Sequence, residues 1–174
     1  IEVTSPAAGE GKTTTVANLA VAFAMAGRRV TIVDCDLRRP RLHAFFGMTN
    51  EKGLTSVLAG DIPLHRALQE GVLPDGRKLQ VLSAGFRAAN PAELVGTARL
   101  AAVFSALKNE HDIVLVDAPP VLPVTDAVLL AGQADCVLLV ALVGKTTGRH
   151  LCRALRAPVA APAPHACVVC TRGT

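Results

Sequence analysis

Residues 5–14 have the residue types of a loop that binds phosphate. Gly9 and Gly11 allow backbone N–H groups to converge on an anion, because glycine tolerates positive φ and leaves room for close approach. Lys12 and Thr13 follow at the start of an expected helix, where the lysine can reach the β- and γ-phosphates and the threonine hydroxyl can coordinate Mg²⁺. Lysine at a helix N-terminus opposes the helix dipole by about 0.3–1 kcal/mol, and a bound anion reverses that penalty. The pattern predicts a site for ATP and Mg²⁺.

The loop is a variant of the strict pattern G-x-x-x-x-G-K-[ST], because Pro6 stands at the position of the first glycine. The loop is still expected between a strand and a helix, as the pattern requires. The residues predicted to contact the nucleotide are Ala8, Gly9, Glu10, Gly11, Lys12, Thr13 and Thr14.

Three aspartates complete the candidate site. Asp34 and Asp36 end an apolar run two positions apart, so their carboxylates are expected on one side of the strand, where two like charges require a cation. Asp117 ends a second apolar run and resembles the aspartate that holds a metal or a metal-bound water in phosphoryl transfer. Together with the Thr13 hydroxyl, these three carboxylates predict a Mg²⁺ site. A polar turn with a helix cap is the alternative for Asp34 and Asp36.

Composition narrows the class of protein. The 174 residues are 51% hydrophobic and 18% charged, which suits one packed domain. Aromatic residues make up only 3%, which favours helices on a buried parallel sheet. A net charge of +4 is too small to indicate nucleic-acid binding. The longest apolar run, residues 136–143, is well short of the roughly 18–20 residues that cross a bilayer. Five cysteines, an odd number, predict no disulfide framework and favour a reducing cytoplasm.

The expected elements alternate between strands and helices. Helices are predicted over residues 13–26, 91–109 and 125–132, and strands over residues 30–33, 79–83, 112–116 and 136–143. Short amphipathic pieces are expected at 53–58 and 63–69. The fold class is α/β: a three-layer P-loop NTPase with a mostly parallel, doubly wound sheet whose ligands lie beyond the carboxyl ends of the strands.

The two ends of the chain are expected to be atypical. Because Ile1 already begins a strand-like run, residues 1–174 are interpreted as a domain truncated at its N-terminus. Residues 157–174 carry Pro158, Pro162 and Pro164 among alanines, and the alternation predicts a helix end and a strand there.

Other residues give weaker signals. Cys167 and Cys170 have metal-ligand spacing, but a buried strand with core cysteines is the favoured interpretation. Asp126 is interpreted as the N-cap of the helix that follows it. Arg38 and Arg39 fit contacts with phosphate or an acidic partner, and a solvated loop fits equally.

Four motifs together resemble the bacterial tyrosine kinases of capsular and exopolysaccharide biosynthesis, within the MinD-like P-loop ATPases. The motifs are Thr4-Ser5-x-x-x-Gly9-Glu10-Gly11-Lys12-Thr13, Val33-Asp34-x-Asp36-x-Arg38-x-Pro40, Asn90-Pro91-x-Glu93-Leu94 and Val116-Asp117-x-Pro119-Pro120-Val121-x-x-x-Thr125-Asp126-Ala127. The resemblance runs from residue 1 to about residue 145. Ala7 stands where the chromosome-partitioning and division-site ATPases carry a signature lysine, which argues against those relatives.

The resemblance implies a protein-tyrosine kinase in which Lys12 contacts the phosphates, Thr13, Asp36 and Asp117 organise Mg²⁺, and Asp34 acts as base on a tyrosine hydroxyl. It further implies a homo-oligomer in the full-length protein and a membrane-embedded polysaccharide co-polymerase, or chain-length regulator, as partner at the inner face of the plasma membrane. The family carries a tyrosine-rich tail, whereas residues 1–174 contain no tyrosine.

Two other functions remain open from the sequence. A switch ATPase would change its affinity for a partner with nucleotide state, without phosphorylating protein. A metal-cluster carrier ATPase would use Cys167 and Cys170.

Overall fold

Seven strands form one sheet in the computed structural model, which describes residues 1–87, 90–159 and 165–172. The strands are β1 (Glu2–Thr4), β2 (Val30–Asp34), β3 (Leu68–Val72), β4 (Lys78–Leu82), β5 (Ile113–Asp117), β6 (Val137–Leu142) and β7 (Ala166–Thr171). Their order across the sheet is β3-β4-β2-β5-β1-β6-β7, and every neighbouring pair is parallel except β3 with β4. The predicted mostly parallel, doubly wound sheet is confirmed.

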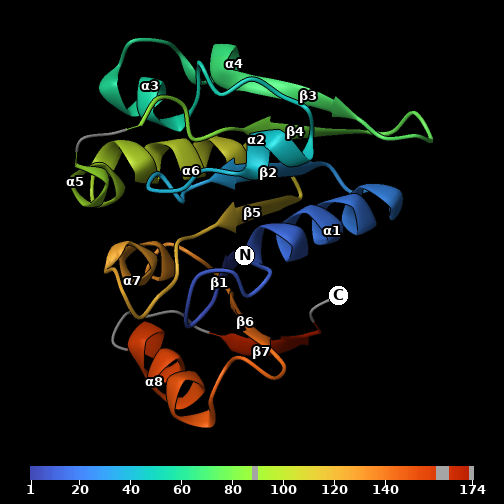
Figure 1. The fold of residues 1–174 in the computed structure, drawn as a ribbon. Helices are drawn as coiled ribbons and strands as arrows, with labels where there is room; N and C mark the ends of the chain where they lie inside the picture. Colours follow the sequence, from blue (N-terminus) through green and yellow to red (C-terminus); the bar gives the residue numbers. More distant parts are fainter. Residues whose placement is uncertain (88–89, 160–164, 173–174) are drawn as a thin grey trace.

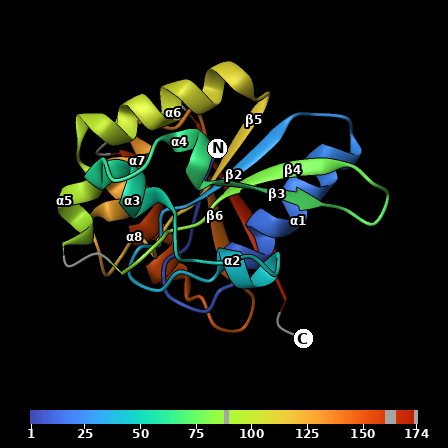
Figure 2. The ribbon, with the colours of Figure 1, turned by 90° about the horizontal axis from the view of Figure 1, so that it is seen from above.

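Helices cover both faces of this sheet (Figures 1 and 2). The helices described are α1 (Lys12–Met25), α2 (Leu42–Phe45), α3 (Leu54–Ala59), α4 (Leu64–Ala67), α5 (Pro91–Val95), α6 (Ala98–Glu110), α7 (Asp126–Ala131) and α8 (Gly148–Val159). One buried cluster joins α1 and α2 to the sheet, through residues such as Val16, Leu42 and Ile32. A second cluster joins α3 and α5–α8 to the other face. The sheet is therefore the middle of three layers, as predicted.

The strand order brings the predicted motifs together. β5 lies between β2 and β1, with Asp34 opposite Asp117 and Val3 opposite Asp117 in the register. Because these strands are parallel, the loops that follow β1, β2 and β5 leave the sheet at the same edge. The order of strands thus places the glycine loop and the aspartates side by side.

Two expectations about the middle of the chain were wrong. The helix expected over 91–109 is two helices, because Thr97 takes an extended conformation (φ −83°, ψ 150°) and its side chain accepts a hydrogen bond from the Leu100 N–H to cap α6. The amphipathic piece at 63–69 ends early at Ala67, and the next residues form β3, which pairs antiparallel with β4. On β3, Glu70 and Val72 are exposed and the other positions are only partly buried. An edge strand of this kind does not need the continuous apolar run of the inner strands.

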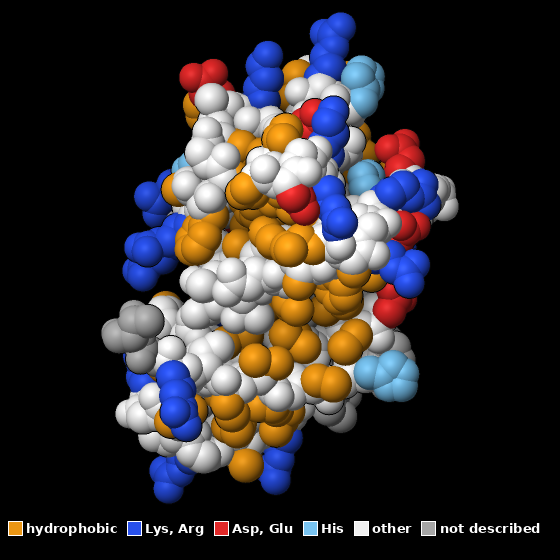
Figure 3. Space-filling model, turned by 90° about the vertical axis from the view of Figure 1, so that its right-hand side faces the viewer, with side chains coloured by type: hydrophobic (Ala, Val, Ile, Leu, Met, Phe, Trp, Pro, Cys, Tyr) orange, Lys and Arg blue, Asp and Glu red, His pale blue; other side chains and the backbone are white. Residues whose placement is uncertain are grey.

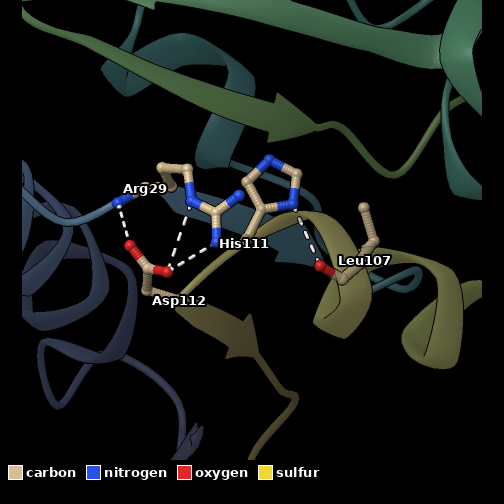
Figure 4. Close-up of polar contacts among 4 residues, drawn as sticks. All are labelled: Arg29, Leu107, His111 and Asp112. Carbon is tan, nitrogen blue, oxygen red and sulfur yellow. Dashed lines mark hydrogen bonds and ion pairs between the residues drawn. The ribbon is translucent and has the colours of Figure 1, made fainter.

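The opposite edge of the sheet, where the strands begin, is held by polar contacts (Figure 4). Asp112 accepts hydrogen bonds from the Arg29 backbone N–H at 2.9 Å and from Arg29 Nη2 at 2.7 Å. These bonds tie the start of β2 to the start of β5, and the arginine holds the Asp112 pKa at about 2. His111 Nδ1 lies 3.0 Å from the Leu107 carbonyl at the end of α6.

Surface charge is mixed in sign. On the face drawn in Figure 3, hydrophobic side chains form a band, with basic and acidic side chains interspersed around it. The net charge of the sequence is a modest +4. Among the helices that the structure describes, none is both long and apolar enough to span a bilayer.

The last described elements are α8 and the edge strand β7, which pairs with β6 over six residues. A helix end and a strand were predicted here, while Pro162 and Pro164 lie outside the described residues. The prediction of buried cysteines was wrong, because Cys167 and Cys170 are both exposed. Because β7 is the edge strand, apolar residues on it remain exposed to solvent. The apolar sequence of residues 166–171 does not reveal that the strand lies at the edge.

Candidate nucleotide site

Two glycines shape the loop between β1 and α1. Gly9 has φ +74° and Gly11 has φ +93°, conformations that L side chains rarely adopt. Gly11 is the N-cap of α1, so the backbone turns directly into the helix at Lys12. The loop therefore directs the unpaired N–H groups of the first helical turn toward one place, as anion binding requires.

A cleft of about 500 Å³ opens in front of this loop. It is lined by Ala8, Gly9, Gly11, Lys12, Thr13, Thr14, Asp36, Arg39, Arg41 and Phe45. Six of the seven residues predicted to contact the nucleotide are among them. The exception is Glu10, whose side chain is buried and turned to other partners. The cleft thus joins the loop after β1 to the segment that follows β2.

Thr13 and Asp117 are in direct contact, although 104 positions separate them in sequence. Thr13 Oγ1 donates a hydrogen bond of 2.7 Å to Asp117 Oδ2. Asp117 is 1% exposed, and its second oxygen, Oδ1, is buried without a hydrogen-bond partner among the described residues. Burial raises the Asp117 pKa to about 6, while the Thr13 hydrogen bond and the charge of Lys12 act in the opposite direction. A buried carboxylate oxygen without a partner beside a hydroxyl fits an oxygen-seeking cation such as Mg²⁺.

Asp34 and Asp36 do not share one environment. Asp36 is partly exposed and lines the cleft. Asp34 is fully buried, and its oxygens accept hydrogen bonds from the backbone N–H groups of Asp36 at 3.2 Å and Leu42 at 3.1 Å. Burial, reinforced by the nearby charge of Asp117, raises the Asp34 pKa well above its usual range. Asp36 therefore lines the cleft, whereas Asp34 is buried and does not line it.

Residues of the loop after β6 form hydrogen bonds with the phosphate loop, residues 5–14. The sequence alone had not indicated these contacts. Glu10 Oε2 accepts a hydrogen bond from the Ala7 N–H at 2.7 Å, and Glu10 Oε1 accepts one from Thr146 Oγ1 at 2.5 Å. Lys145 Nζ donates to the carbonyls of Ala8 at 3.0 Å and Gly9 at 3.4 Å. Lys145 and Thr146 lie in the turn after β6 and belong to no recognisable motif. The sequence alone therefore contains no sign that they contact the phosphate loop.

Arg38 contacts a buried acid within the chain. Its Nε donates to Asp126 Oδ2 at 3.0 Å, and the Asp126 side chain is 2% exposed. The N-cap prediction for Asp126 was wrong, since Thr125 is the N-cap of α7 and Asp126 is the first helical residue. Arg38 therefore fixes the loop after β2 to the start of α7 and does not line the cleft.

Within the described residues, no group of three or more His, Cys, Asp or Glu side chains is placed to hold a metal ion. A Mg²⁺ site here accordingly needs the Thr13 hydroxyl and phosphate oxygens beside the carboxylates. Cys167 and Cys170 are three residues apart on β7, so they face opposite sides of the sheet. One chain cannot hold a metal cluster between them.

Comparison with known proteins finds one matching family model and similar tyrosine-protein kinases. A family model described as "AAA domain" matches residues 1–149. The tyrosine-protein kinase YwqD of Bacillus subtilis (strain 168) is 39% identical over 157 residues, or 90% of this chain. The chain spans 65% of the length of that relative.

Solved structures share the fold. The kinase domain of the Escherichia coli tyrosine kinase ETK superposes with a TM-score of 0.92 at 29% identity, covering 98% of this chain and 66% of that one. A cobyrinic acid a,c-diamide synthase from Mycobacterium smegmatis, with bound ADP and magnesium, superposes with a TM-score of 0.81 at 24% identity, covering 97% of this chain and 72% of that one. The latter likeness concerns the fold alone.

Proposed function

This chain belongs to the AAA domain family and to the bacterial tyrosine kinases, and we propose that it transfers the γ-phosphate of ATP to a tyrosine hydroxyl. The observation that carries the proposal is the cleft in which the glycine loop, Lys12, Thr13 and Asp36 meet, with Asp117 bonded to Thr13. These groups come from three neighbouring strand ends, and phosphoryl transfer needs all of them at one place.

Each residue has a defined task in this proposal. The loop N–H groups and Lys12 bind the phosphates, and Thr13, Asp36 and Asp117 would hold Mg²⁺, which would neutralise charge on the phosphate oxygens. The phenol oxygen forms a bond to the γ-phosphorus, the bond from that phosphorus to the β,γ-bridging oxygen breaks, and ADP leaves with the electron pair. The phenol proton passes to a carboxylate.

Asp34 is the proposed acceptor of that proton, by resemblance to the family. A base needs hydrogen-bond reach to the hydroxyl, directly or through one water. The buried Asp34 carboxylate must therefore act through a water or after the segment following β2 has shifted. Asp34→Asn tests the role: it should abolish tyrosine phosphorylation while leaving the affinity for ATP within about threefold of wild type.

A second function is favoured by the hydrogen bonding of Asp34. Because both Asp34 oxygens already accept backbone hydrogen bonds, the site fits a switch ATPase that hydrolyses ATP and never phosphorylates protein. Release of inorganic phosphate without phosphotyrosine on any added peptide would establish the switch ATPase and overturn the kinase proposal.

The deciding experiment uses ATP, Mg²⁺ and a tyrosine-containing peptide, with phosphotyrosine and inorganic phosphate both measured. Lys12→Met and Asp117→Asn should reduce phosphotyrosine by more than about 100-fold, since each removes charge stabilisation of the transferring phosphate. The matched controls are Lys52→Met and Asp135→Asn at exposed positions, which should keep wild-type rates.

We also propose, from the same relationship, that the full-length protein is a homo-oligomer. It works at the inner face of the plasma membrane with a membrane-embedded polysaccharide co-polymerase. Support comes from the resemblance to kinases of capsule and exopolysaccharide systems. Co-purification of the full-length protein with the co-polymerase from detergent-solubilised membranes, lost after Lys12→Met if binding follows nucleotide state, tests this pairing.

A further inference from the structure

Three side chains at the outer part of the cleft are not used by the proposed binding of phosphate and Mg²⁺. Arg39, Arg41 and Phe45 follow β2 and line the same cleft as Lys12 and Asp36. In Figure 2, α2 lies at the same end of the molecule as the loop that leads into α1. All three side chains are exposed, and Phe45 is 50% exposed although it is aromatic. These three residues are called the rim below.

The two rim arginines are available to a ligand. Their neighbour Arg38 is paired with Asp126 at 3.0 Å, and among the described residues no ion pair involves Arg39 or Arg41. Arg39 is anchored by its backbone, whose N–H donates to Asp36 Oδ1 at 3.1 Å, so its side chain emerges beside a residue of the proposed Mg²⁺ site. The rim therefore presents two guanidinium groups next to the place of phosphate transfer.

A tyrosine that receives phosphate must come from outside residues 1–174, because the sequence contains none. The rim residues line the cleft that such a tyrosine must enter. Guanidinium groups pair with carboxylates in a planar, two-bond geometry, and an exposed aromatic ring offers a surface on which another ring can pack.

We propose that the rim selects a polypeptide segment in which the tyrosine is flanked by aspartate or glutamate. Arg39 and Arg41 pair with the flanking carboxylates, and Phe45 packs against the tyrosine ring or its apolar neighbours. This inference rests on the proposed kinase function, because it names the class of segment that the same site accepts. Exposed ion pairs are weak, so each arginine should contribute about fivefold to peptide affinity.

The test compares three fluorescent peptides of equal length, with the cores Glu-Glu-Tyr-Glu-Glu, Ala-Ala-Tyr-Ala-Ala and Lys-Lys-Tyr-Lys-Lys. Binding is measured by anisotropy with Mg²⁺ and a non-hydrolysable ATP analogue, and phosphate transfer is measured separately with ATP. The full chain is compared with the variant Arg39→Glu/Arg41→Glu. The matched control is Arg28→Glu/Arg153→Glu, which changes net charge equally at exposed positions outside the cleft.

The acidic peptide should bind wild type at least tenfold more tightly than the basic peptide, and the rim variant should reverse that order while the control keeps it. Affinity for the ATP analogue alone should stay within about threefold in the rim variant. Equal binding of all three peptides would overturn the inference. So would a loss of ATP-analogue affinity in the rim variant that matches the loss of peptide binding, because the arginines would then be nucleotide ligands.

The measurement of phosphate transfer distinguishes failure of the kinase function from failure of the selection by the rim. If the acidic peptide binds preferentially but is not phosphorylated, the selection by the rim stands and the kinase function fails. If all three peptides are phosphorylated equally well and bind equally, the kinase function stands and the selection by the rim fails.

Discussion

Thr146 Oγ1 donates a 2.5 Å hydrogen bond to Glu10 Oε1, across 136 positions of sequence. The same carboxylate accepts the Ala7 N–H, and the Glu10 carbonyl accepts a hydrogen bond from Thr171 Oγ1 at 3.1 Å. One buried acid therefore links the phosphate loop to the ends of β6 and β7. We therefore expect the position of the phosphate loop to depend on β6 and β7, the two strands that follow β1 in the order of the sheet.

Thr146→Val should weaken ATP binding about tenfold, with little change in the rate at saturating ATP. A hydrogen bond to a charged group is worth about 1.5–3 kcal/mol, and its loss leaves a buried carboxylate oxygen without a partner beside the loop. Calorimetric titration with ATP and Mg²⁺ measures the effect. Thr146→Ser, which keeps the hydroxyl, should restore affinity, and Ser105→Ala, which removes an exposed hydroxyl on α6, should match wild type. Wild-type affinity in Thr146→Val would show that the link does not position the loop.

Gly53→Ala should destabilise the fold by about 3 kcal/mol or more. A Cβ at this position would clash with the Ser83 carbonyl oxygen and the Gly85 nitrogen, and backbone atoms cannot move aside as a side chain can. Urea denaturation followed by circular dichroism gives the free energy of unfolding.

Gly47→Ala is the control for Gly53→Ala. Gly47 has φ +62° but nothing lies within 4 Å of its added Cβ, so only conformational strain of about 1–2 kcal/mol is expected. A smaller loss at Gly53 than at Gly47 would contradict the close approach of the two backbone segments.

Much of the fold was predictable because its determinants are local. The apolar residues of α1 recur at helical spacing, and Val16, Ala20 and Ala24 are buried as that spacing requires. The strands β2 and β5 are mostly apolar runs that end on acids, and this pattern placed Asp36 and Asp117 at one edge of the sheet. The break at Thr97 was missed because Gly96 and Thr97 sit within an otherwise regular helical pattern, and the side-chain cap that begins α6 competes with helix continuation.

The remaining features of the site depend on tertiary contacts. Asp34 and Asp36 look equivalent in sequence, yet Leu42 donates a backbone hydrogen bond to Asp34 at 3.1 Å from eight positions away and keeps it out of the cleft. Likewise, Lys145 reaches the Ala8 carbonyl across 137 positions. No local pattern encodes either contact, because both are set by how the loops fold over the sheet.

Stability should fall as pH rises from about 4.5 to about 8, because of Glu2. This side chain is fully buried on β1, both its oxygens lack a hydrogen-bond partner among the described residues, and burial raises its pKa from 4.5 to about 8. The folded state therefore keeps its proton in a range where the unfolded state has lost it. The stabilising effect is complete below pH 4.5 and is lost as pH rises through the folded pKa, by at most about 1.4 kcal/mol per pH unit.

Glu2→Gln removes one of three buried carboxyl groups with a raised pKa, the others being Asp34 and Asp117, and should make this pH dependence shallower. The variant should therefore gain stability over wild type at pH 8 but not at pH 4.5. Urea denaturation at several pH values gives the comparison. Glu110→Gln, at an exposed position, is the matched control and should keep the wild-type slope. An unchanged slope in Glu2→Gln would show that Glu2 is not the group responsible.

Arg38→Met should lower the free energy of unfolding by about 2–3 kcal/mol. The change leaves the Asp126 carboxylate, 2% exposed, without its ionic partner, and a buried unpaired charge is costly. The expected loss lies below the range for a fully buried pair because the Arg38 side chain is 41% exposed and partly screened by water. Asp126→Asn should cost less, since it removes the buried charge together with the pairing. A double-mutant cycle that combines the two changes should recover a coupling energy of about 1–2 kcal/mol, and a coupling near zero would show that Arg38 contributes only surface charge.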